Sequence, residues 1–485
     1  SLYNVSKVPV RLPFRSNYGG IDELGGKLLL VDRQGPAWLL DDNYKAEQLS
    51  FTVPTNTEEY VASQIAFEKL EPYRQNWTGR SQARFGVRDI LVVPDPDGAT
   101  LWASYFRWYE AEACLTVNVA GLALNLDGTP RQSASAWQHV YESTPCLGLD
   151  EDDGYLWMED GGGRIVQFDD HRLLLTIGDF GYDGMKSKGK LRPQLDDNHY
   201  GKIILIDLNG GAAQIHTKGH RNPQGLVVAA DGQIYSTEHG PVGGDELNLI
   251  TAGANYGWPV VSYGRTCIEA GSCTDDDGLS GNSRLNWNIG EHAGDFQRPI
   301  YSWVPSIGIS NLIAVRGTLF ERWKDDLLVS SLKQKTLYRV RLRDGRAAFA
   351  EPVINLGRRI RDLIEMSDGR IILKPDSNVL FVLTPDISRR TNVIAQCSAC
   401  HTFMQGQPHG IGPNLWGVFG SATAAQPGFE YSAALSAAKT TWTREKLAEF
   451  LSNPQSFAPG SSMVYEMQSA EDVEVAIDFL ESLND

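Results

Sequence analysis

The sequence has no long apolar run, a deficit of positive charge and few cysteines. No hydrophobic stretch approaches the roughly 20 residues that a membrane-spanning helix requires. Lysine and arginine together number 44 against 60 aspartates and glutamates, so the formal net charge is −16. This charge argues against nucleic acid and anionic membrane surfaces as partners. The 485 residues, of which 42% are hydrophobic, are enough for two or more soluble globular domains with ample cores.

Only six cysteines are present, and two of them lie three residues apart near the C-terminus. The other four allow three disulfide pairings. We favour Cys267 with Cys273, which can close a small loop, and the leftover pair Cys114 with Cys146. Buried free thiols are the alternative. Paired cysteines would indicate an oxidising compartment, the bacterial periplasm or the cell exterior.

The segment Cys397-Ser398-Ala399-Cys400-His401 has the spacing of a covalent haem attachment site. Two thiols three residues apart fit the two vinyl groups of a haem, and the adjacent histidine then falls under the iron. A structural zinc site or a redox CxxC motif is the alternative. Two further features follow this segment, Gly410-Ile-Gly-Pro-Asn-Leu-Trp-Gly417 and the run Ala-Pro-Gly-Ser-Ser before Met463.

Together these features resemble class I cytochrome c over roughly the last hundred residues, about one small domain. The resemblance implies that the carbonyl of Pro413 fixes the imidazole of His401 and that Met463 is the sixth iron ligand. Met467 competes for that role, and so does Met404, which is too near the histidine to reach the opposite face easily. We therefore predict a class I cytochrome c domain at residues 386–485, with haem c bound covalently by Cys397 and Cys400.

Before that domain, one unit recurs: a short apolar run, a turn often containing Asp-Gly, and a second apolar run. Such units are typical of antiparallel hairpins. No long stretch of helical period occurs before residue 386. About six units predict an all-β, six-bladed β-propeller at residues 1–385, followed by a small all-α domain; a large sandwich is the alternative. The paired runs are 27–32 with 37–40, 89–93 with 101–105, 165–168 with 173–177, 226–229 with 233–236, 327–330 with 336–342, and 362–366 with 370–373.

The remaining segments complete this division of the chain. Residues 1–20 carry little signal and are assigned to wrapping an edge of the propeller. Pro385–Asn392 is interpreted as the linker. Thr443–Leu451 and Ala470–Leu483 have helical spacing, as expected for small helices around a haem. Because Ser1 begins without a signal peptide, the chain is expected to be a processed, mature form.

The densest polar motifs lie between Gly219 and Pro259: GHRNPQGL, EHGP, DELNLI and NYGWP. Here the chain resembles the soluble quinoprotein glucose dehydrogenase and aldose sugar dehydrogenase family. The resemblance runs from about Phe85 to Thr384 and implies a six-bladed propeller that binds pyrroloquinoline quinone (PQQ) and calcium. Further matches are TIGD at Thr176–Asp179, PSI after Val304, SLK at Ser331–Lys333 and RIRD at Arg359–Asp362.

The resemblance implies a role for each residue type at these positions. PQQ carries three carboxylates, so cations are expected on one rim of its pocket, where arginine can form a planar fork. Arginine can also stabilise an oxygen that gains charge during the reaction, and carbonyl oxygens suit calcium. A solvated surface charge is the alternative for any one of these cations. The assigned residues are Lys333, Arg359 and Arg361 for the carboxylates, Arg221 for the oxygen, Asn222 for the cofactor edge, the carbonyls of Gly240 and Pro241 for the calcium at the cofactor, and Asp245 and Glu246 for further structural calcium.

The chain departs from the family where the base should be. The family has a histidine before the segment leading to TIGD, and counting back from Arg164 puts Asp160 in its place. Asp160 is therefore the predicted base, with Asp179 raising its pKa by like-charge repulsion. Capping of the glycine turn that follows is the alternative role of Asp160. His239 is the substitute base, and Arg84 stands where a cofactor-contacting glutamine is usual.

These features predict a periplasmic or secreted quinohaemoprotein dehydrogenase. A sugar or alcohol would be oxidised with PQQ at the propeller axis, and electrons would pass to the fused haem and on to a partner cytochrome or oxidase. Fusion raises the effective concentration of donor and acceptor. The alternatives are a PQQ-free propeller that serves as a docking or binding module for the cytochrome, and a calcium-dependent propeller hydrolase.

Overall fold

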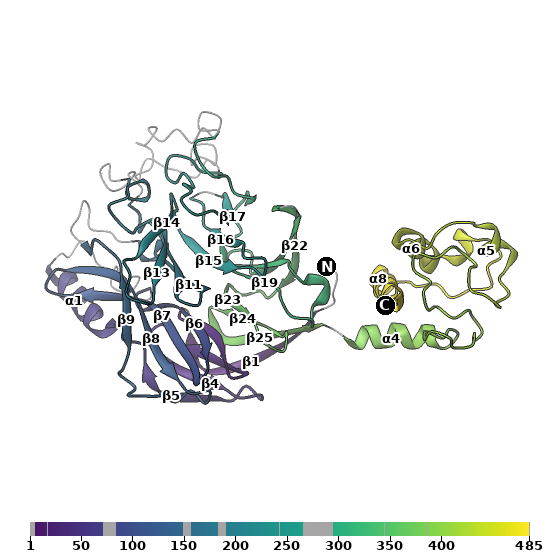
Figure 1. Cartoon of the computed structure of the whole chain (residues 1–485), viewed down its shortest axis with the longest axis horizontal. Coiled ribbons are helices and arrows are strands. Elements are labelled where there is room, and N and C mark those ends of the chain that lie inside the picture. The colour runs from purple at the N-terminus through teal and green to yellow at the C-terminus, as the bar shows by residue number, and fades with distance from the viewer. Residues whose placement is uncertain are drawn as a thin grey trace. The chain divides into compact units, whose positions relative to one another are not determined.

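The computed structural model describes residues 5–16, 18–70, 84–148, 157–182, 191–241, 243–264, 294–343, 345–385 and 387–484. The chain divides into two compact units, with Lys7–Thr384 in one and Pro385–Asp485 in the other. The first is built mainly of strands and the second of short helices (Figure 1). Of the helices described, none is both long and apolar enough to cross a membrane.

The larger unit is a six-bladed β-propeller in the part of the chain described, as the sequence predicted. Each blade is an antiparallel sheet whose strands mostly follow one another along the chain. The first blade consists of β2 (Gly20–Leu24), β3 (Lys27–Val31), β4 (Pro36–Leu40) and β5 (Ala46–Thr52), and the second of β6 (Val87–Asp95), β7 (Gly98–Tyr109), β8 (Cys114–Leu124), β9 (Gln138–Glu142) and β10 (Leu147–Gly148). The third consists of β11 (Gly162–Asp169), β12 (Arg172–Ile177), β13 (Lys202–Asp207) and β14 (Gln214–Lys218), and the fourth of β15 (Pro223–Val228), β16 (Ile234–Glu238), β17 (Asp245–Ile250) and β18 (Tyr301–Trp303). The fifth consists of β19 (Ile309–Ala314), β20 (Leu327–Ser331), β21 (Thr336–Arg343) and β22 (Arg346–Asn355), and the sixth of β23 (Ile360–Glu365), β24 (Ile371–Pro375), β25 (Ser377–Pro385) and β1 (Val5–Ser16). The exceptions to the chain order are β1, which pairs with β25, and β10, which pairs with β8.

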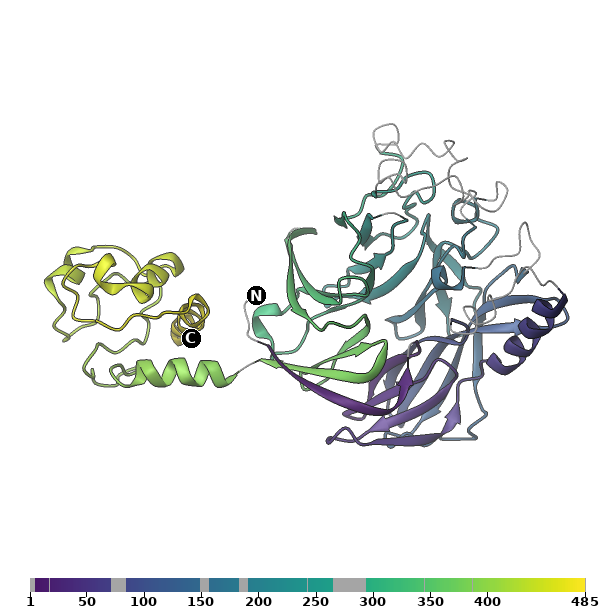
Figure 2. The same ribbon diagram turned by 180° about the vertical axis from the view of Figure 1, so that it is seen from behind.

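The innermost strands close into a ring around the propeller axis. β2 contacts β6, and the contacts continue through β11, β15, β19 and β23 back to β2. β1 lies beside β25, so the first strand of the chain completes the last blade (Figures 1 and 2). Closure of this kind packs each blade between two neighbours, so no blade face is left uncovered at the ends of the ring.

One helix was missed, because α1 (Thr57–Leu70) lies before residue 386, where no helical stretch was expected (Figure 2). Its sequence lacks a clear apolar stripe, so periodicity could not reveal it. Packing stabilises it instead: the buried ring of Tyr60 stacks on Phe85 with centroids 4.2 Å apart. The indole nitrogen of Trp108 also donates to the Ser63 hydroxyl at 3.0 Å. Tertiary contacts thus decide this helix.

The disulfide between Cys114 and Cys146 is present, as predicted. It joins the start of β8 to the segment before β10. Cys267 and Cys273 lie outside the described residues.

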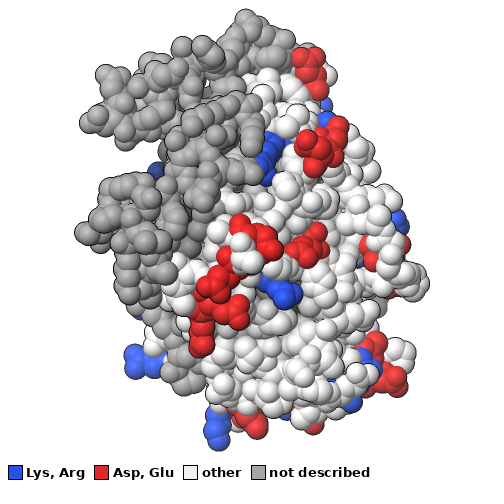
Figure 3. Space-filling model, turned by 90° about the vertical axis from the view of Figure 1, so that its left-hand side faces the viewer, with Lys and Arg blue, Asp and Glu red and all other residues white. Residues whose placement is uncertain are grey.

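The acidic composition is visible on the surface, where acidic side chains gather across the middle of one face with few basic ones among them (Figure 3).

The smaller unit contains short helices around a compact core. The predicted helices at 443–451 and 470–483 are confirmed as α6 and α8, and the side chains of Thr443 and Ser469 cap their N-termini. The linker prediction was wrong in part, because a helix begins at Ile387 and continues to the CxxC motif. Val393 of this helix is buried in the core beside the last helix, so packing holds a segment whose first residues look like a loop. The helices are α4 (Ile387–Ser398), α5 (Ala433–Ala437), α6 (Arg444–Ser452), α7 (Pro454–Phe457) and α8 (Ala470–Glu481).

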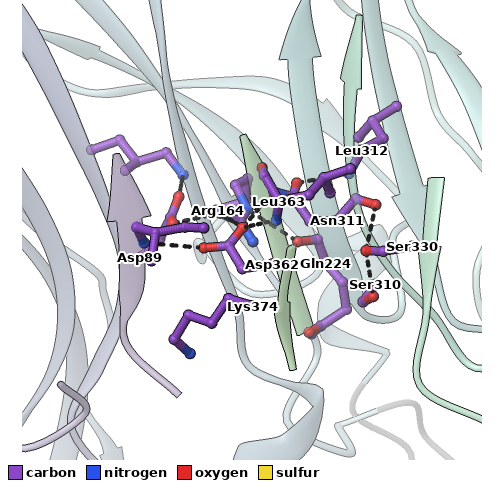
Figure 4. A network of polar contacts seen from close by, with 12 residues as sticks. Asp89, Arg164, Gln224, Ser310, Asn311, Leu312, Ser330, Asp362, Leu363 and Lys374 are labelled. Atoms are coloured by element: carbon purple, nitrogen blue, oxygen red, sulfur yellow. Dashed lines mark hydrogen bonds and ion pairs between the residues drawn. The ribbon is translucent and has the colours of Figure 1, made fainter. Parts of the chain in front are cut away.

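A buried polar network crosses the propeller axis (Figure 4). Arg164 of β11 reaches Asp89 of β6 at 2.5 Å and Asp362 of β23 at 3.2 Å. Asn311 of β19 donates to Asp362 at 2.7 Å, and Arg164 donates to the carbonyl of Gln224 in β15. One guanidinium and one carboxylate therefore tie together inner strands from different blades, which are far apart along the chain.

Asp22 of β2 extends the acidic side of this network and makes propeller stability depend on pH. Burial raises the pKa of Asp22 to about 7, and repulsion from Asp362 contributes. An unfolded chain releases this proton near pH 4, so the folded state binds more protons between about pH 4 and 7. Stability from this group is therefore present at low pH and lost as the pH rises through about 7.

We expect Asp22→Asn to remove this pH dependence. Relative to the variant, the parent should lose at most about 1.4 kcal/mol of unfolding free energy per pH unit between pH 4 and 7. Denaturant unfolding of the propeller across that range measures the difference. Asp97, whose side chain is 87% exposed, gives the control Asp97→Asn. A constant difference between the parent and Asp22→Asn would contradict the prediction.

Candidate functional site

Irregularities in the inner strands fall mainly at polar residues. Pairing with the second strand shifts in register within five of the described inner strands. A bulge leaves its extra residue unpaired and re-aims it, which is common beside functional sites. The residues at these shifts are Arg88, Gly163 with Arg164, Gln224, Ser310 with Asn311, and Arg361.

Asp160 lies at the centre of the candidate site. It ends the short 3-10 helix η2 (Met158–Asp160), and its side chain is buried. Arg221 reaches one carboxylate oxygen at 2.8 Å, and the amide of Asn222 donates to the other at 2.9 Å. Three residues predicted for one site therefore do come together, although 61 positions separate Asp160 from Arg221. The carboxylate thus accepts from a guanidinium and an amide, and these charge-assisted contacts fix its orientation.

Asp179 has a different neighbour. The indole nitrogen of Trp258 donates to its carboxylate at 2.7 Å, and the amide of Gly181 donates at 2.8 Å. The guanidinium of Arg221 lies 5.6 Å from the centre of the Trp258 ring. Asp179 thus holds the indole that Arg221 packs against. Asp160 itself is paired with Arg221, and the predicted influence of Asp179 on Asp160 stays a prediction.

Behind Arg221 lies a hydrogen-bonded pair to which sequence reasoning gave no role. The carboxylate of Glu238 accepts from the backbone amide of Arg221 and bonds Nδ1 of His220 at 3.0 Å. Nε2 of His220 bonds the hydroxyl of Thr217 at 2.9 Å, and the imidazole is fully buried. Both residues stood in the polar motifs, but only the fold shows that they fix the backbone beneath Arg221.

His239 lies near the same group and is half-buried. Its Nδ1 is 4.0 Å from a carboxylate oxygen of Asp245. Burial lowers the pKa of His239, so the ring is neutral near pH 7 and can accept a proton. A small pocket opens between Arg221, Glu238, His239, Gly240 and Pro241. His239 therefore has both the position and the protonation state that a substitute base needs.

The side chains assigned to structural calcium, those of Asp245 and Glu246, make hydrogen bonds within the protein, and the calcium sites stay predictions. Asp245 accepts hydrogen bonds from the Ser306 hydroxyl at 2.8 Å and from the amides of Ile309 and Gly240. Burial and repulsion from Glu238 raise the pKa of Glu246 well above its usual range. Successive strand residues point to opposite faces, so Asp245 and Glu246 do not share one ion. Within the described ranges, no group of three or more His, Cys, Asp or Glu could hold a metal.

The cations assigned to the cofactor carboxylates are partly tied down. The guanidinium of Arg361 donates two hydrogen bonds to the carboxylate of Asp376, at 2.5 and 2.7 Å. Arg359 forms an ion pair with the same carboxylate at 3.2 Å. Burial alone would raise the pKa of Asp376, but these hydrogen bonds lower it below its usual range. Lys333 is exposed in the turn between β20 and β21. Sequence reasoning missed Asp376, which gives this rim a counter-charge.

Arg84, which stands where a glutamine is usual in the family, forms an ion pair in this structure. Its guanidinium pairs with Glu159 at 2.9 Å, beside Asp160 in η2. Burial raises the pKa of Glu159, and Arg84 partly opposes that rise. The substitution of Arg84 for glutamine is therefore accompanied by an acidic partner in the same wall of the site.

The haem motif has the geometry that its sequence predicted. Nδ1 of His401 bonds the carbonyl of Pro413 at 2.8 Å, and burial lowers the pKa of His401, so the imidazole is neutral and suited to bind iron. A Cβ on Gly412 would lie 2.3 Å from the His401 ring, so only glycine leaves room for it. Cys397 and Cys400 are free thiols, as attachment requires.

The methionines are also distinguished by their surroundings. Met463 is half-buried and packs at the edge of the helical core. Met467 is only 5% exposed inside that core, and Met404 is 67% exposed. The assignment of Met463 as the sixth ligand stays a prediction. The residues of the smaller unit thus suit a haem.

The fold and the C-terminal motif define a six-bladed propeller protein that carries a cytochrome c-like region. The chain belongs to the glucose/sorbosone dehydrogenase family, whose model matches residues 68–381.

Among curated relatives, the chain is 32% identical to an uncharacterised protein of Synechocystis over 45% of this chain and 53% of that protein. It is 27% identical to quinoprotein glucose dehydrogenase B of Acinetobacter calcoaceticus over 46% of this chain and 58% of that enzyme. The matches therefore span little more than half the length of these relatives. A cytochrome c homolog of Bradyrhizobium diazoefficiens is 41% identical over 81 residues, which is 16% of this chain and 44% of that protein.

Among solved structures, the apo form of the soluble aldose sugar dehydrogenase of Escherichia coli superposes with a TM-score of 0.59. The match covers 79% of this chain and 100% of the other, at 19% sequence identity. At that identity the likeness concerns the fold, and it agrees with the propeller described above.

Proposed function

We propose that this protein is a quinohaemoprotein dehydrogenase of the periplasm or cell exterior that oxidises a sugar or alcohol. The observation that carries the proposal is the cluster of Asp160, Arg221 and Asn222 at the propeller axis, in a chain that also contains a haem-binding motif. The quinoprotein glucose dehydrogenase among the relatives supports the reaction class. The disulfide supports an oxidising compartment.

The residues of the propeller divide into a proton acceptor and its supports. Asp160 removes the hydroxyl proton of the substrate, because a carboxylate can act as a general base and this one lies beside Arg221 and Asn222. Arg221 and Asn222 orient it, while Trp258 and Glu238 fix Arg221. When bound, PQQ supplies the two-electron acceptor, with Lys333, Arg359 and Arg361 on its carboxylates and the carbonyls of Gly240 and Pro241 on a calcium ion.

The residues of the smaller unit hold the electron carrier. Cys397 and Cys400 would attach haem c, and His401 and Met463 would ligate its iron. Haem c supplies a one-electron relay to an external cytochrome or oxidase. Because both sites belong to one chain, each sees the other at an effective concentration that does not fall on dilution.

A reduction assay tests the proposed function. The full chain with haem attached is mixed with PQQ and calcium, and haem absorbance is followed while neutral sugars, sugar acids and alcohols are added in turn. Reduction that requires both PQQ and a substrate supports the dehydrogenase. If the haem stays oxidised with every substrate, whether or not PQQ binds, the result favours the PQQ-free docking module.

Arg361→Ala is expected to weaken PQQ binding by about tenfold or more, because it removes a charge-assisted fork from the cofactor rim. The haem spectrum should not change, since Arg361 lies in the other unit. Calorimetric titration with PQQ measures the affinity. Arg346→Ala, in an exposed strand position, is the control. Equal affinity in the parent and Arg361→Ala would mean that Arg361 serves only its contact with Asp376.

A further inference from the structure

Arg88 of β6 is a buried cation whose described contacts include no carboxylate. The residue is only 7% exposed, and its guanidinium donates to the carbonyls of Gly162 at 3.0 Å and Arg84 at 3.4 Å. Burial lowers the pKa of Arg88 to about 10, so it remains charged at neutral pH. Buried charges in proteins are ordinarily paired, because an isolated one is costly. This cation therefore requires a counter-charge.

The neighbouring carboxylates are already engaged. Glu159, which acts on Arg88 from a distance, is paired with Arg84 at 2.9 Å. Asp89, the next residue along β6, faces Arg164 and accepts from the amide of Ile165. Among the described contacts, Arg88 therefore donates to backbone carbonyls, while the nearby carboxylates pair with other cations.

A second arginine lies close to Arg88 and adds to the local positive charge. Arg88-Asp89 and Arg361-Asp362 occupy matching bulges in the inner strands of two blades. Both guanidinium groups contact the ring of Tyr18, at 5.0 Å and 4.1 Å from its centre. Arg361 is neutralised by Asp376, whereas Arg88 is not. Repulsion from Arg361 helps to lower the pKa of Arg88, and an anion would relieve it.

The local backbone is shaped to accommodate this side chain. A Cβ on Gly163 would lie 2.4 Å from the Cβ of Arg88, and Gly163 has a φ of +110°. Only glycine satisfies both conditions at low cost. Phe106, 4.9 Å from the guanidinium carbon, covers Arg88 on another side. Arg88 is thus a buried and closely packed cation rather than a solvated surface charge.

We propose that Arg88 binds a carboxylate of the ligand at the propeller axis. The carboxylate belongs either to the quinone cofactor or to an acidic substrate such as a sugar acid. This inference rests on the proposed function for the location of its ligand, but the binding of a carboxylate by Arg88 is measured directly. A planar guanidinium carries paired N–H donors that match a carboxylate, as the point charge of a lysine would not.

The experiment compares the full chain with Arg88→Met, which keeps apolar packing against Tyr18 and Phe106 but removes the charge. Arg88→Gln is the second neutral variant and decides the question if the methionine variant does not fold. Arg107→Met is the matched control, because exposed Arg107 also packs on a tyrosine, 5.3 Å from the Tyr109 ring. Calorimetric titrations use PQQ with calcium, D-glucuronate and D-glucose as probes.

A loss of PQQ affinity of about tenfold or more in the neutral variants assigns the carboxylate to the cofactor. A comparable loss for glucuronate, with PQQ and glucose affinities unchanged, assigns it to the substrate. If both neutral variants bind all three probes within twofold of the parent, the proposal is overturned. A parent that binds glucuronate but no PQQ would refute the proposed function while leaving the Arg88 site intact.

Discussion

Asp160→Asn is expected to lower turnover by about two or more orders of magnitude with PQQ and calcium bound. The substitution keeps the size of the side chain and an oxygen that can accept from Asn222, now at 2.9 Å. It removes the negative charge that Arg221 faces and the ability to accept the substrate proton. Steady-state reduction of haem by the best substrate measures turnover, and calorimetry shows that PQQ is still bound.

Glu159→Gln provides the control for Asp160→Asn. It neutralises the adjacent carboxylate, which pairs with Arg84 rather than with Arg221. Its turnover should stay within a few-fold of the parent. Turnover of Asp160→Asn within the same range would rule Asp160 out as the base. His239→Asn should then produce the large loss, because His239 is the neighbouring group with a neutral, proton-accepting ring.

Met463→Ala is expected to abolish the methionine–iron charge-transfer band and to lower the reduction potential of the haem. The thioether stabilises reduced iron, so its loss favours the oxidised form. Electron transfer to the external acceptor would change, while PQQ binding in the propeller would not. Optical spectra of the oxidised protein and a redox titration of the haem measure both effects.

Met467→Leu is the matched control for this substitution. Met467 is only 5% exposed in the helical core, and leucine conserves its volume, so the band should persist. Met404→Ala tests the exposed competitor. An unchanged band in Met463→Ala, together with its loss in either of the other variants, would transfer the ligand role.

Sequence patterns revealed those parts of the structure whose causes are local. The haem motif spans only Cys397 to His401, and its spacing alone fits a haem. Short apolar runs around Asp-Gly turns predict hairpins. One example is the turn at Ala230–Gly232, which lies between β15 and β16. Two helices of the smaller unit were visible because cap residues and apolar spacing coincide within a few turns.

Features that depend on distant contacts were not visible in this way. The helix α1 has no apolar stripe and is held by Phe85 and Trp108. The helix α4 begins in a polar segment and is held by packing at its other end. In both cases the stabilising surface comes from another part of the chain, which periodicity within the helix cannot report.

The sequence by itself determined that a propeller built of hairpins is followed by a haem-binding unit, and which residues are candidates for the site. Tertiary structure alone decided their partners: Arg221 for Asp160, Trp258 for Asp179 and Asp376 for Arg361. It also brought Arg88 to the ring of Tyr18. The reason is that blade closure places residues from opposite ends of the chain beside one axis, where burial makes each charge depend on whichever neighbour the fold supplies.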